Sequence, residues 1–231
     1  MRFAGRLLVG GEEVRILSDR WYLERNAPGR AVLEVEAAAP LAGLVTYAIG
    51  WGGQVEPWFT GYVVASIAID AKRQRLRIAE VDRVLGLPVP MALRNVPAQA
   101  MLAAVSEATG VTWRIGPGVD LATRCAHLVN LGTARAALQR LGALLGVAEW
   151  TIQATPTGEV YLGPAAGLHP RDVQLPAATL SEVTTEGASI GALPRLRPGS
   201  TVRPGNGDAM AIGAVELSAD TYRLHWERAR P

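Results

Sequence analysis

Short stretches in which polar and apolar residues alternate are the feature that most restricts the fold of this chain. In residues 30–38, Glu34 and Glu36 alternate with apolar residues, and residues 221–226 show the same two-residue repeat. Successive side chains of a β-strand point to opposite faces of its sheet, so this repeat is typical of strands with one buried face. The sequence therefore predicts β-structure near both ends of the chain.

Glycine and proline divide residues 1–82 into short segments. Residues 61–70 and 75–81 are expected to be the two strands of a hairpin, with the turn between them. Frequent turns between short strands are typical of a β-barrel or a β-sandwich. After a linker at residues 163–170, residues 197–226 are expected to form three short strands joined by tight turns.

The middle of the chain has a different character. A helix is expected over residues 95–110, with Pro97 in its first turn and Gly110 at its end, and a second helix over residues 133–146. After each helix, a Gly-Val pair leads to a strand that carries a tryptophan. Two interpretations stay open: two helix–strand units related by a pseudo-twofold axis, or the independent use of glycine to end each helix.

These patterns predict a mainly β fold with a small α/β insert. The expected domains are a first β-domain at residues 1–84, an α/β insert at residues 85–165 and a second β-domain at residues 166–231. No apolar run is long enough to span a bilayer or to serve as a secretory signal, so we expect a soluble, uncleaved chain.

Composition excludes several classes of site. Cys125 is the single cysteine, which rules out an intrachain disulfide and a thiolate metal cage. The 23 basic residues nearly balance the 21 acidic ones, and Lys72 is the only lysine. The basic stretch at residues 72–77 alternates with apolar positions, which is typical of a solvated strand face rather than of a patch that follows nucleic-acid phosphates.

No motif for catalysis or metal binding is complete. A phosphate-binding Gly-Lys pair, a His-Glu-x-x-His helix and a calcium loop are all missing. His127, His169 and His225 are too far apart in sequence to predict a zinc site. We therefore expect no catalytic residue, no cofactor and no metal ion.

One five-residue pattern matches the nucleophile elbow of hydrolases. Ser189 lies at the centre of a Gly-x-Ser-x-Gly sequence, and His225 follows it in the order of a catalytic triad. An elbow requires a helix directly after the serine, and Pro194 and Pro198 forbid one here. We therefore do not expect a hydrolase from this motif.

Three ordered segments carry a resemblance to a known family. They are a Phe-x-Gly-Tyr-Val strand and hairpin followed by a helix ending in Thr-Gly (residues 59–113), a helix leading to a hairpin with a Pro-x-Gly turn (136–163), and the closing strands (193–226). Together they resemble tailed-phage baseplate and tail-tip hub proteins, which are related to contractile-tail and type VI secretion spike hubs. The loop at residues 203–213 departs from the glycine-rich turn expected in that family.

The resemblance implies two tube-like β-barrel domains in one chain, flanking or surrounding the helix–strand domain. Three chains would then form a pseudo-sixfold ring that caps the tail tube and forms part of the DNA ejection channel. Glu34 and Glu36 would suit the channel wall, because acidic side chains do not bind DNA phosphates. The four aromatic residues near the start, Trp21, Tyr22, Trp51 and Trp58, are expected to anchor the first barrel.

The partners implied by the resemblance are two further copies of the chain, a distal-tail or tail-tube protein, and other tail-tip, fibre or tape-measure proteins. DNA would be present only in transit, with no stable membrane association. The protein would be made in the bacterial host cytoplasm and would reside at the virion tail tip or baseplate. Alternatives are a hexameric distal-tail ring protein with one barrel, a tail-associated cell-wall hydrolase, and a ligand- or nucleic-acid-binding module that uses the aromatic first barrel.

Overall fold

The computed structural model describes residues 2–168, 172–205 and 207–227. The chain forms two compact units: a β unit made of Met1–Glu80 and His169–Pro231, and an insert unit, Val81–Leu168. Within the described residues, both α-helices belong to the insert unit. The expected fold class, mainly β with a small α/β insert, is confirmed.

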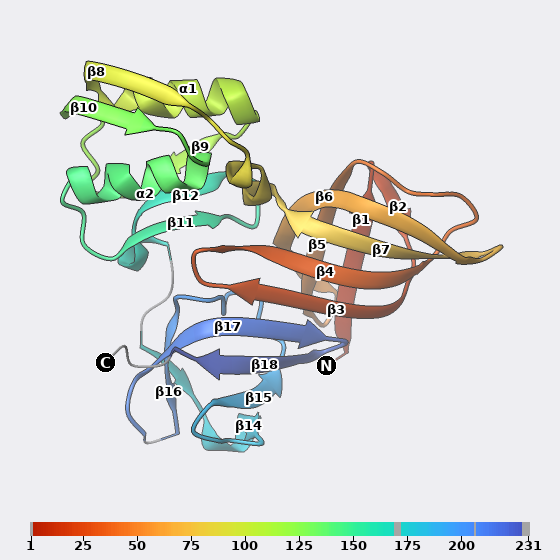
Figure 1. Ribbon diagram of the computed structural model, residues 1–231. Helices are drawn as coiled ribbons and strands as arrows, with labels where there is room; N and C mark the ends of the chain where they lie inside the picture. Colours follow the sequence, from red (N-terminus) through yellow and green to blue (C-terminus); the bar gives the residue numbers. More distant parts are fainter. Residues whose placement is uncertain (1, 169–171, 206, 228–231) are drawn as a thin grey trace. The chain divides into compact units, whose positions relative to one another are not determined.

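The first seven strands of the β unit form the front module (Figure 1). They are β1 (Phe3–Val9), β2 (Glu12–Val14), β3 (Ile16–Glu24), β4 (Ala27–Glu36), β5 (Leu44–Trp51), β6 (Gln54–Asp70) and β7 (Arg73–Glu80). Their order in the sheet is β3-β4-β7-β6-β5-β1-β2, and neighbouring strands are antiparallel. The predicted hairpin is formed by β6 and β7, with a tighter turn than expected because β7 already begins at Arg73.

The strands after the insert form the rear module. They are β13 (Val173–Leu175), β14 (Leu180–Ser181), β15 (Gly187–Gly191), β16 (Thr201–Pro204), β17 (Met210–Ser218) and β18 (Thr221–Trp226). Their order is β14-β15-β18-β17-β16-β13. β17 also pairs with β3, with Val215 opposite Leu23 and Leu217 opposite Trp21. The two modules therefore share one continuous sheet, in which β17 lies beside β3 (Figure 1).

One hydrophobic core serves both modules. Trp21 stacks on Tyr47 with 4.4 Å between ring centroids, and Trp58 packs edge-on against Trp21. From the rear module, Tyr222 lies with its ring centroid 6.0 Å from that of Trp58. Burial of each such ring contributes on the order of 2 kcal/mol. Because the sheet and the core are shared, the first and last predicted domains lie in a single compact unit.

The four aromatic residues expected to anchor the front module differ in burial. Trp21 and Trp58 are fully buried. Trp51 is half-buried, and its indole Nε1 donates a hydrogen bond to a backbone carbonyl of the rear module at 2.7 Å. Tyr22 lies on the outer face of the sheet, where the Arg30 guanidinium sits 4.3 Å from its ring centroid. Trp21 and Trp58 thus belong to the core, whereas Trp51 and Tyr22 lie at its margin.

All residues of the insert unit are described. Its elements are the 3-10 turns η1 (Val81–Gly86) and η2 (Ala165–Gly167), the strands β8 (Met91–Pro97), β9 (Trp113–Ile115), β10 (Arg124–Asn130), β11 (Trp150–Ala154) and β12 (Val160–Pro164), and the helices α1 (Ala98–Thr109) and α2 (Ala134–Leu144). β8 pairs with β10, while β12 lies between β11 and β9. Each half runs strand–helix–strand, as β8-α1-β9 and β10-α2-β11, which favours the interpretation of two related helix–strand units.

The helix ends follow the predicted signals with one exception. The Thr133 side chain accepts a hydrogen bond from the backbone N–H of Ala136 at the start of α2, and Gly110 ends α1 in the left-handed conformation. The predicted start of α1 at residue 95 is wrong. Pro97 precedes the helix in an extended conformation and is the last residue of β8, because the strand pairing with β10 continues to that point.

Candidate assembly surface

The front and rear modules repeat one connectivity. The front module has the order β3-β4-β7-β6-β5-β1, and the rear module has the order β14-β15-β18-β17-β16-β13. When the two orders are aligned position by position, β3, β4, β7, β6, β5 and β1 correspond to β14, β15, β18, β17, β16 and β13. The corresponding strands also follow one another in the same order along the chain. The orders differ at β2, which has no counterpart among the described strands, and at β13, which is parallel to β16.

Part of the register is repeated as well, in the hairpins β6–β7 and β17–β18, although β6 has a second irregularity, between Ala68 and Asp70, that β17 lacks. Each first strand has an irregularity, directly after Val63 in one hairpin and directly after Ile212 in the other. In both hairpins it lies opposite the fifth and sixth residues of the second strand. Leu76 and Leu224 then occupy the same position, and both are fully buried. A shared position of a β-bulge supports true equivalence of the two hairpins, since bulges are specific features of a strand pair.

Polar contacts fix the junction where β3 meets β17. Arg20 forms an ion pair with Glu216 at 2.9 Å. At the turn after β17, the backbone N–H of Ala219 donates to the Asp19 carboxylate at 3.0 Å. Burial raises the pKa of Asp19, although this hydrogen bond and a second one from Trp21 lower it. The junction therefore combines backbone pairing with one ion pair and one capped turn.

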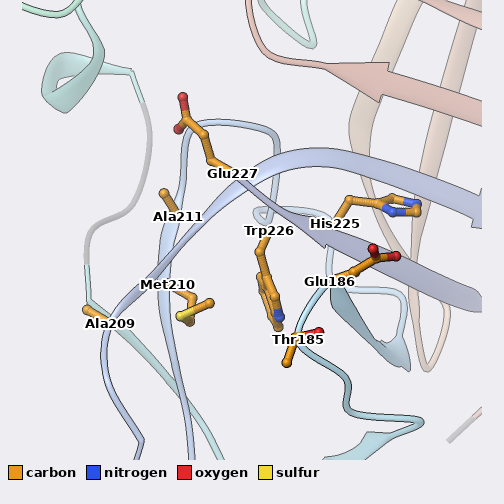
Figure 2. A pocket seen from close by; sticks show the side chains of 8 residues that line it. All are labelled: Thr185, Glu186, Ala209, Met210, Ala211, His225, Trp226 and Glu227. Carbon is orange, nitrogen blue, oxygen red and sulfur yellow. The ribbon is translucent and has the colours of Figure 1, made fainter. Parts of the chain in front are cut away.

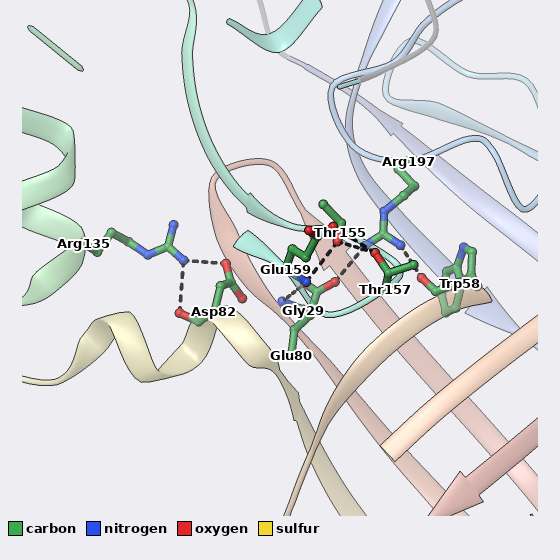
Figure 3. Close-up of polar contacts among 9 residues, drawn as sticks. All are labelled: Gly29, Trp58, Glu80, Asp82, Arg135, Thr155, Thr157, Glu159 and Arg197. Atoms are coloured by element: carbon green, nitrogen blue, oxygen red, sulfur yellow. Dashed lines mark hydrogen bonds and ion pairs between the residues drawn. The ribbon is translucent and has the colours of Figure 1, made fainter. Parts of the chain in front are cut away.

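A buried ion pair also joins the two modules (Figure 3). Arg197 lies 2.7 Å from Glu80, the last residue of β7, and both side chains are almost fully buried. The second carboxylate oxygen of Glu80 accepts the backbone N–H of Gly29 at 2.8 Å, and Arg197 also donates to the carbonyl of Trp58. Burying two charges is favourable only when hydrogen bonds satisfy their remaining atoms, as these do.

The insert unit has a similar pair of its own (Figure 3). Arg135, at the start of α2, lies 2.6 Å from Asp82 of η1 and also donates to the carbonyl of Ile152 at 3.2 Å. The Asp82 side chain is fully buried. The pair holds η1, α2 and β11 together within this unit.

Exposed apolar side chains gather on the far half of β6. Tyr62, Val64, Ile67 and Ile69 are 47%, 55%, 52% and 37% exposed. Strand pairing with β5 ends at Tyr62, and beyond that residue the described strand pairing of β6 is with β7. The Val63 N–H still donates to the Gly43 carbonyl at 3.1 Å, and the Ser66 hydroxyl accepts the Leu41 N–H at 3.1 Å. An unpaired strand edge with apolar side chains is a template for association, which soluble monomers normally avoid.

Glu34 and Glu36, the predicted channel-wall residues, lie on the outer face of β4. Arg75 of β7 is 2.8 Å from Glu34, and Arg15 is 3.3 Å from Glu36. Both carboxylates are partly exposed and face an arginine across the strand pair or turn. Their charge on this face is therefore largely compensated.

Ser189 lies in the middle of β15, hydrogen-bonded between two other strands rather than at a turn into a helix. Its hydroxyl donates to the Glu182 carboxylate at 3.0 Å, and the residue opposite it on β18 is Arg223. His225 lies opposite Gly187 instead. The geometry of a nucleophile elbow is therefore not formed at this motif.

The remaining candidates do not form a chemical cluster. His169 lies outside the described residues, while His127 and the buried Cys125 belong to β10 of the insert unit. A hollow of the rear module contains His225, with Trp226 and Met210 pointing into it (Figure 2). Among the described residues there is no group of three His, Cys, Asp or Glu side chains that could hold a metal ion. Nor does that part of the chain contain a helix able to cross a membrane.

Solved structures share this architecture over almost its full length. A 43 kDa tail protein of prophage MuSo2 from Shewanella oneidensis matches with a TM-score of 0.69 and 12% identity, covering 99% of this chain and 98% of that one. The tail protein from Neisseria meningitidis MC58 gives 0.66 and 10%, with 99% and 97% covered. The fold is that of phage tail proteins. The E. coli c3393 protein, a component of the type VI secretion system, has a TM-score of 0.62 and 10% identity, with 97% and 77% covered.

The structural matches confirm, at the level of the fold, the resemblance to tail-tip hubs and their secretion-system relatives that the sequence suggested. No protein-family model and no curated protein sequence matches the chain. The residues described above do not form a catalytic arrangement of side chains. The distinctive feature of the fold in this chain is the repeated β-module.

Proposed function

We propose that this chain is a structural hub protein of a phage baseplate or tail tip. The observation that carries the proposal is the repetition of strand order and hairpin register between the front and rear modules. The fold shared with solved phage tail proteins supports it.

Two equivalent modules in one chain allow a threefold assembly to present sixfold symmetry. Three copies would place six β-modules around one axis, in a ring that fits a sixfold tail tube on one side and a threefold tip on the other. The β3–β17 pairing supplies a model for the contact between neighbouring modules, because it already joins two of them by backbone hydrogen bonds and a shared core.

In this assembly the ring forms part of the channel through which DNA leaves the particle. We assign Glu34 and Glu36 to the channel wall. Because Arg75 and Arg15 compensate their charges, this face would neither bind DNA phosphates strongly nor repel them strongly. Rapid transit requires such weak contacts, since each phosphate held by an arginine would slow the DNA.

The ring would bind a distal-tail or tail-tube protein on its sixfold side. Fibre, tape-measure or other tail-tip proteins would occupy the remaining surfaces, and no stable membrane association is needed. The protein would be assembled in the cytoplasm of the bacterial host and would then reside in the virion tail.

A hexameric distal-tail ring protein is the second candidate. It needs only one β-module per chain, whereas this chain has two that share a sheet. A cell-wall hydrolase is less favoured, because Ser189 lies within a strand and donates to Glu182. An aromatic binding groove in the front module is also disfavoured, since Trp21 and Trp58 are fully buried.

Native mass spectrometry of the purified chain, alone and mixed with the tail-tube protein of the same phage or prophage, tests the proposal. A trimer, formed alone or on the tube protein, is the expected result. A hexamer would favour the distal-tail alternative. A chain that stays monomeric with and without the tube protein would contradict the proposal, and release of fragments from purified peptidoglycan would revive the hydrolase.

A further inference from the structure

β8 and β10 form a two-stranded ribbon in the insert unit, and its two faces differ sharply. The structure describes every residue of this unit, and within it the two strands pair only with each other. The inner face of the ribbon joins the hydrophobic core of the unit through four side chains: Met91, Leu93, Cys125 and Leu128. The outer face is turned away from that core, so its side chains belong to the surface of the unit.

The outer face consists of three consecutive cross-strand pairs: Pro90–Leu131, Ala92–Val129 and Arg94–His127. The second and third pairs are formed within the two strands. The first follows from the same count, and the bridge between Pro88 and Thr133 shows that the count continues beyond it. All six side chains are exposed. The face is therefore apolar at one end and basic at the other.

The apolar end is held in place by hydrogen bonds. Leu131 is 85% exposed and Val129 is 46% exposed. The side-chain amide of Asn130 donates to the Val89 carbonyl at 2.8 Å and to the Gly132 carbonyl at 3.0 Å. Because the chain is fixed on both sides of Leu131, this leucine is presented to solvent by an ordered framework. Adjoining exposed apolar side chains beside polar ones are typical of an interaction site.

The basic end has no acidic side chain in either strand. Arg94 forms no ion pair among the residues of the described insert unit, and Arg124 donates to the Asn95 side chain at 2.9 Å, which keeps it on the ribbon. The preceding acid, Asp120, accepts the hydroxyl of Thr123 at 2.9 Å. A partner that covers this end must therefore supply negative charge, because burying arginine without a counter-charge is costly.

The arrangement favours a protein segment over nucleic acid as the occupant. Nucleic acid carries phosphates along its whole length and is bound by a continuous basic stripe, whereas half of this face is apolar. An apolar side chain and a carboxylate on one segment would match both ends. Leu131 and His127 are four strand residues apart, about 13 Å at about 3.3 Å per residue. That span corresponds to about four residues of an extended segment or about nine residues of a helix.

We propose that the outer face of the β8–β10 ribbon docks an acidic segment of another tail protein. An apolar side chain of the segment packs against Leu131 and Val129, and a carboxylate about 13 Å away pairs with Arg94. Charge complementarity of this kind sets the direction in which the segment lies along the ribbon. The inference rests on the proposed function, which supplies the class of partner, and deepens it by naming a docking surface.

Photocrosslinking tests the position of the partner. The full chain carrying benzoylphenylalanine in place of Leu131 is assembled with the tube, distal-tail and tape-measure proteins of the same phage or prophage and irradiated. We expect an adduct with one of these proteins, at a segment that has Asp or Glu at the predicted spacing. The same probe at Val183, which is 59% exposed in the rear module, is the control and should not label that segment. No adduct at residue 131, or an adduct only with a second copy of the chain or with DNA, would overturn the proposal.

Charge substitution tests the chemistry of the contact with the partner protein that the crosslink identifies. Arg94→Glu should weaken binding of that protein at least tenfold, and a carboxylate-to-lysine change in its crosslinked segment should restore binding to this variant. Arg114→Glu is the matched control, since Arg114 is an exposed arginine of β9 in the same unit. It should bind as the wild type does, and both variants should keep the circular dichroism of the wild type. Equal weakening by the two substitutions would contradict the contact at Arg94.

Native mass spectrometry separates this inference from the proposed function. Arg94→Glu should still form the trimer expected of the hub. A chain that forms this trimer but gives no adduct at residue 131 overturns the docking surface and leaves the hub proposal in place. A chain that forms no ring, but labels an acidic segment of a tail protein from residue 131, overturns the hub proposal and supports the docking surface.

Discussion

Arg197 and Glu80 form a buried ion pair although 117 residues separate them in the sequence. Their side chains are only 6% and 1% exposed, and the shortest N–O distance is 2.7 Å. Glu80 ends the last strand of the front module, and Arg197 lies in the loop between β15 and β16 of the rear module. The pair therefore fastens the two modules to each other independently of the β3–β17 pairing.

Arg197→Met is expected to destabilise the β unit by about 3–5 kcal/mol, because it leaves the Glu80 carboxylate buried without its partner. Urea unfolding followed by tryptophan fluorescence measures the change. Arg195→Met is the control: its partner Glu56 is 3.4 Å away, and the two side chains are 82% and 52% exposed. That variant should lose at most about 1 kcal/mol. Equal losses in the two variants would contradict the assigned role of the buried pair.

Gly142→Ala is expected to destabilise the insert unit. A Cβ atom at this position of α2 would lie 2.3 Å from Cγ of Trp150, so the indole would have to move. Overpacking of this kind costs about 1–3 kcal/mol and should change the Trp150 fluorescence. At Gly86 a Cβ would meet no atom within 4 Å, so Gly86→Ala is the control. A similar free energy of unfolding for both variants would argue against close packing at Trp150.

Alkaline pH should unfold the β unit through its buried tyrosines. Burial raises the pKa of Tyr47 and Tyr222 far above the ordinary value of 10.0. The folded state holds these protons more tightly than the unfolded state, so their contribution to stability is complete below pH 10 and is lost as the pH rises above it. Tyrosinate absorbance should therefore show a late phase that coincides with unfolding.

Tyr47→Phe and Tyr222→Phe should each reduce that late phase by one of the five tyrosines in the chain. Complete ionisation of all tyrosines while the circular dichroism of the folded protein persists would show that these side chains are not buried.

Reversal of charge on the proposed channel wall should slow DNA ejection. Arginine at both Glu34 and Glu36 would place uncompensated positive charge beside Arg75 and Arg15, and DNA phosphates would bind there. Ejection kinetics of particles carrying the double variant measure the effect, which should weaken as salt is raised. The double variant Glu12→Arg/Glu13→Arg on β2 changes the net charge equally. Unchanged ejection in the β4 variant would remove the channel-wall assignment.

Local patterns were enough to predict much of the fold. Polar–apolar alternation identified β4 and β18, and the glycine and threonine signals placed the two helices, apart from the start of α1. The strand β8 was missed because Pro97 reads as a first-turn helix residue, whereas its pairing with β10 depends on residues about 30 positions later in the chain.

The assembly surface could not be predicted in this way. Pairing between β3 and β17 joins residues about 190 positions apart, and alternation alone does not specify which strand is the partner. Equivalence of the modules is also hidden in the sequence, because matched positions such as Ile67 and Glu216 differ in residue type. Only the shared order and register of the strands reveal it.

Electron cryomicroscopy of the chain bound to its tail tube, reconstructed without imposed symmetry, tests the central claim most directly. We predict three copies around the axis, with front and rear modules alternating to give six similar β-modules. A ring in which each copy contributes one module to the sixfold layer, or a single copy at the tip, would contradict it.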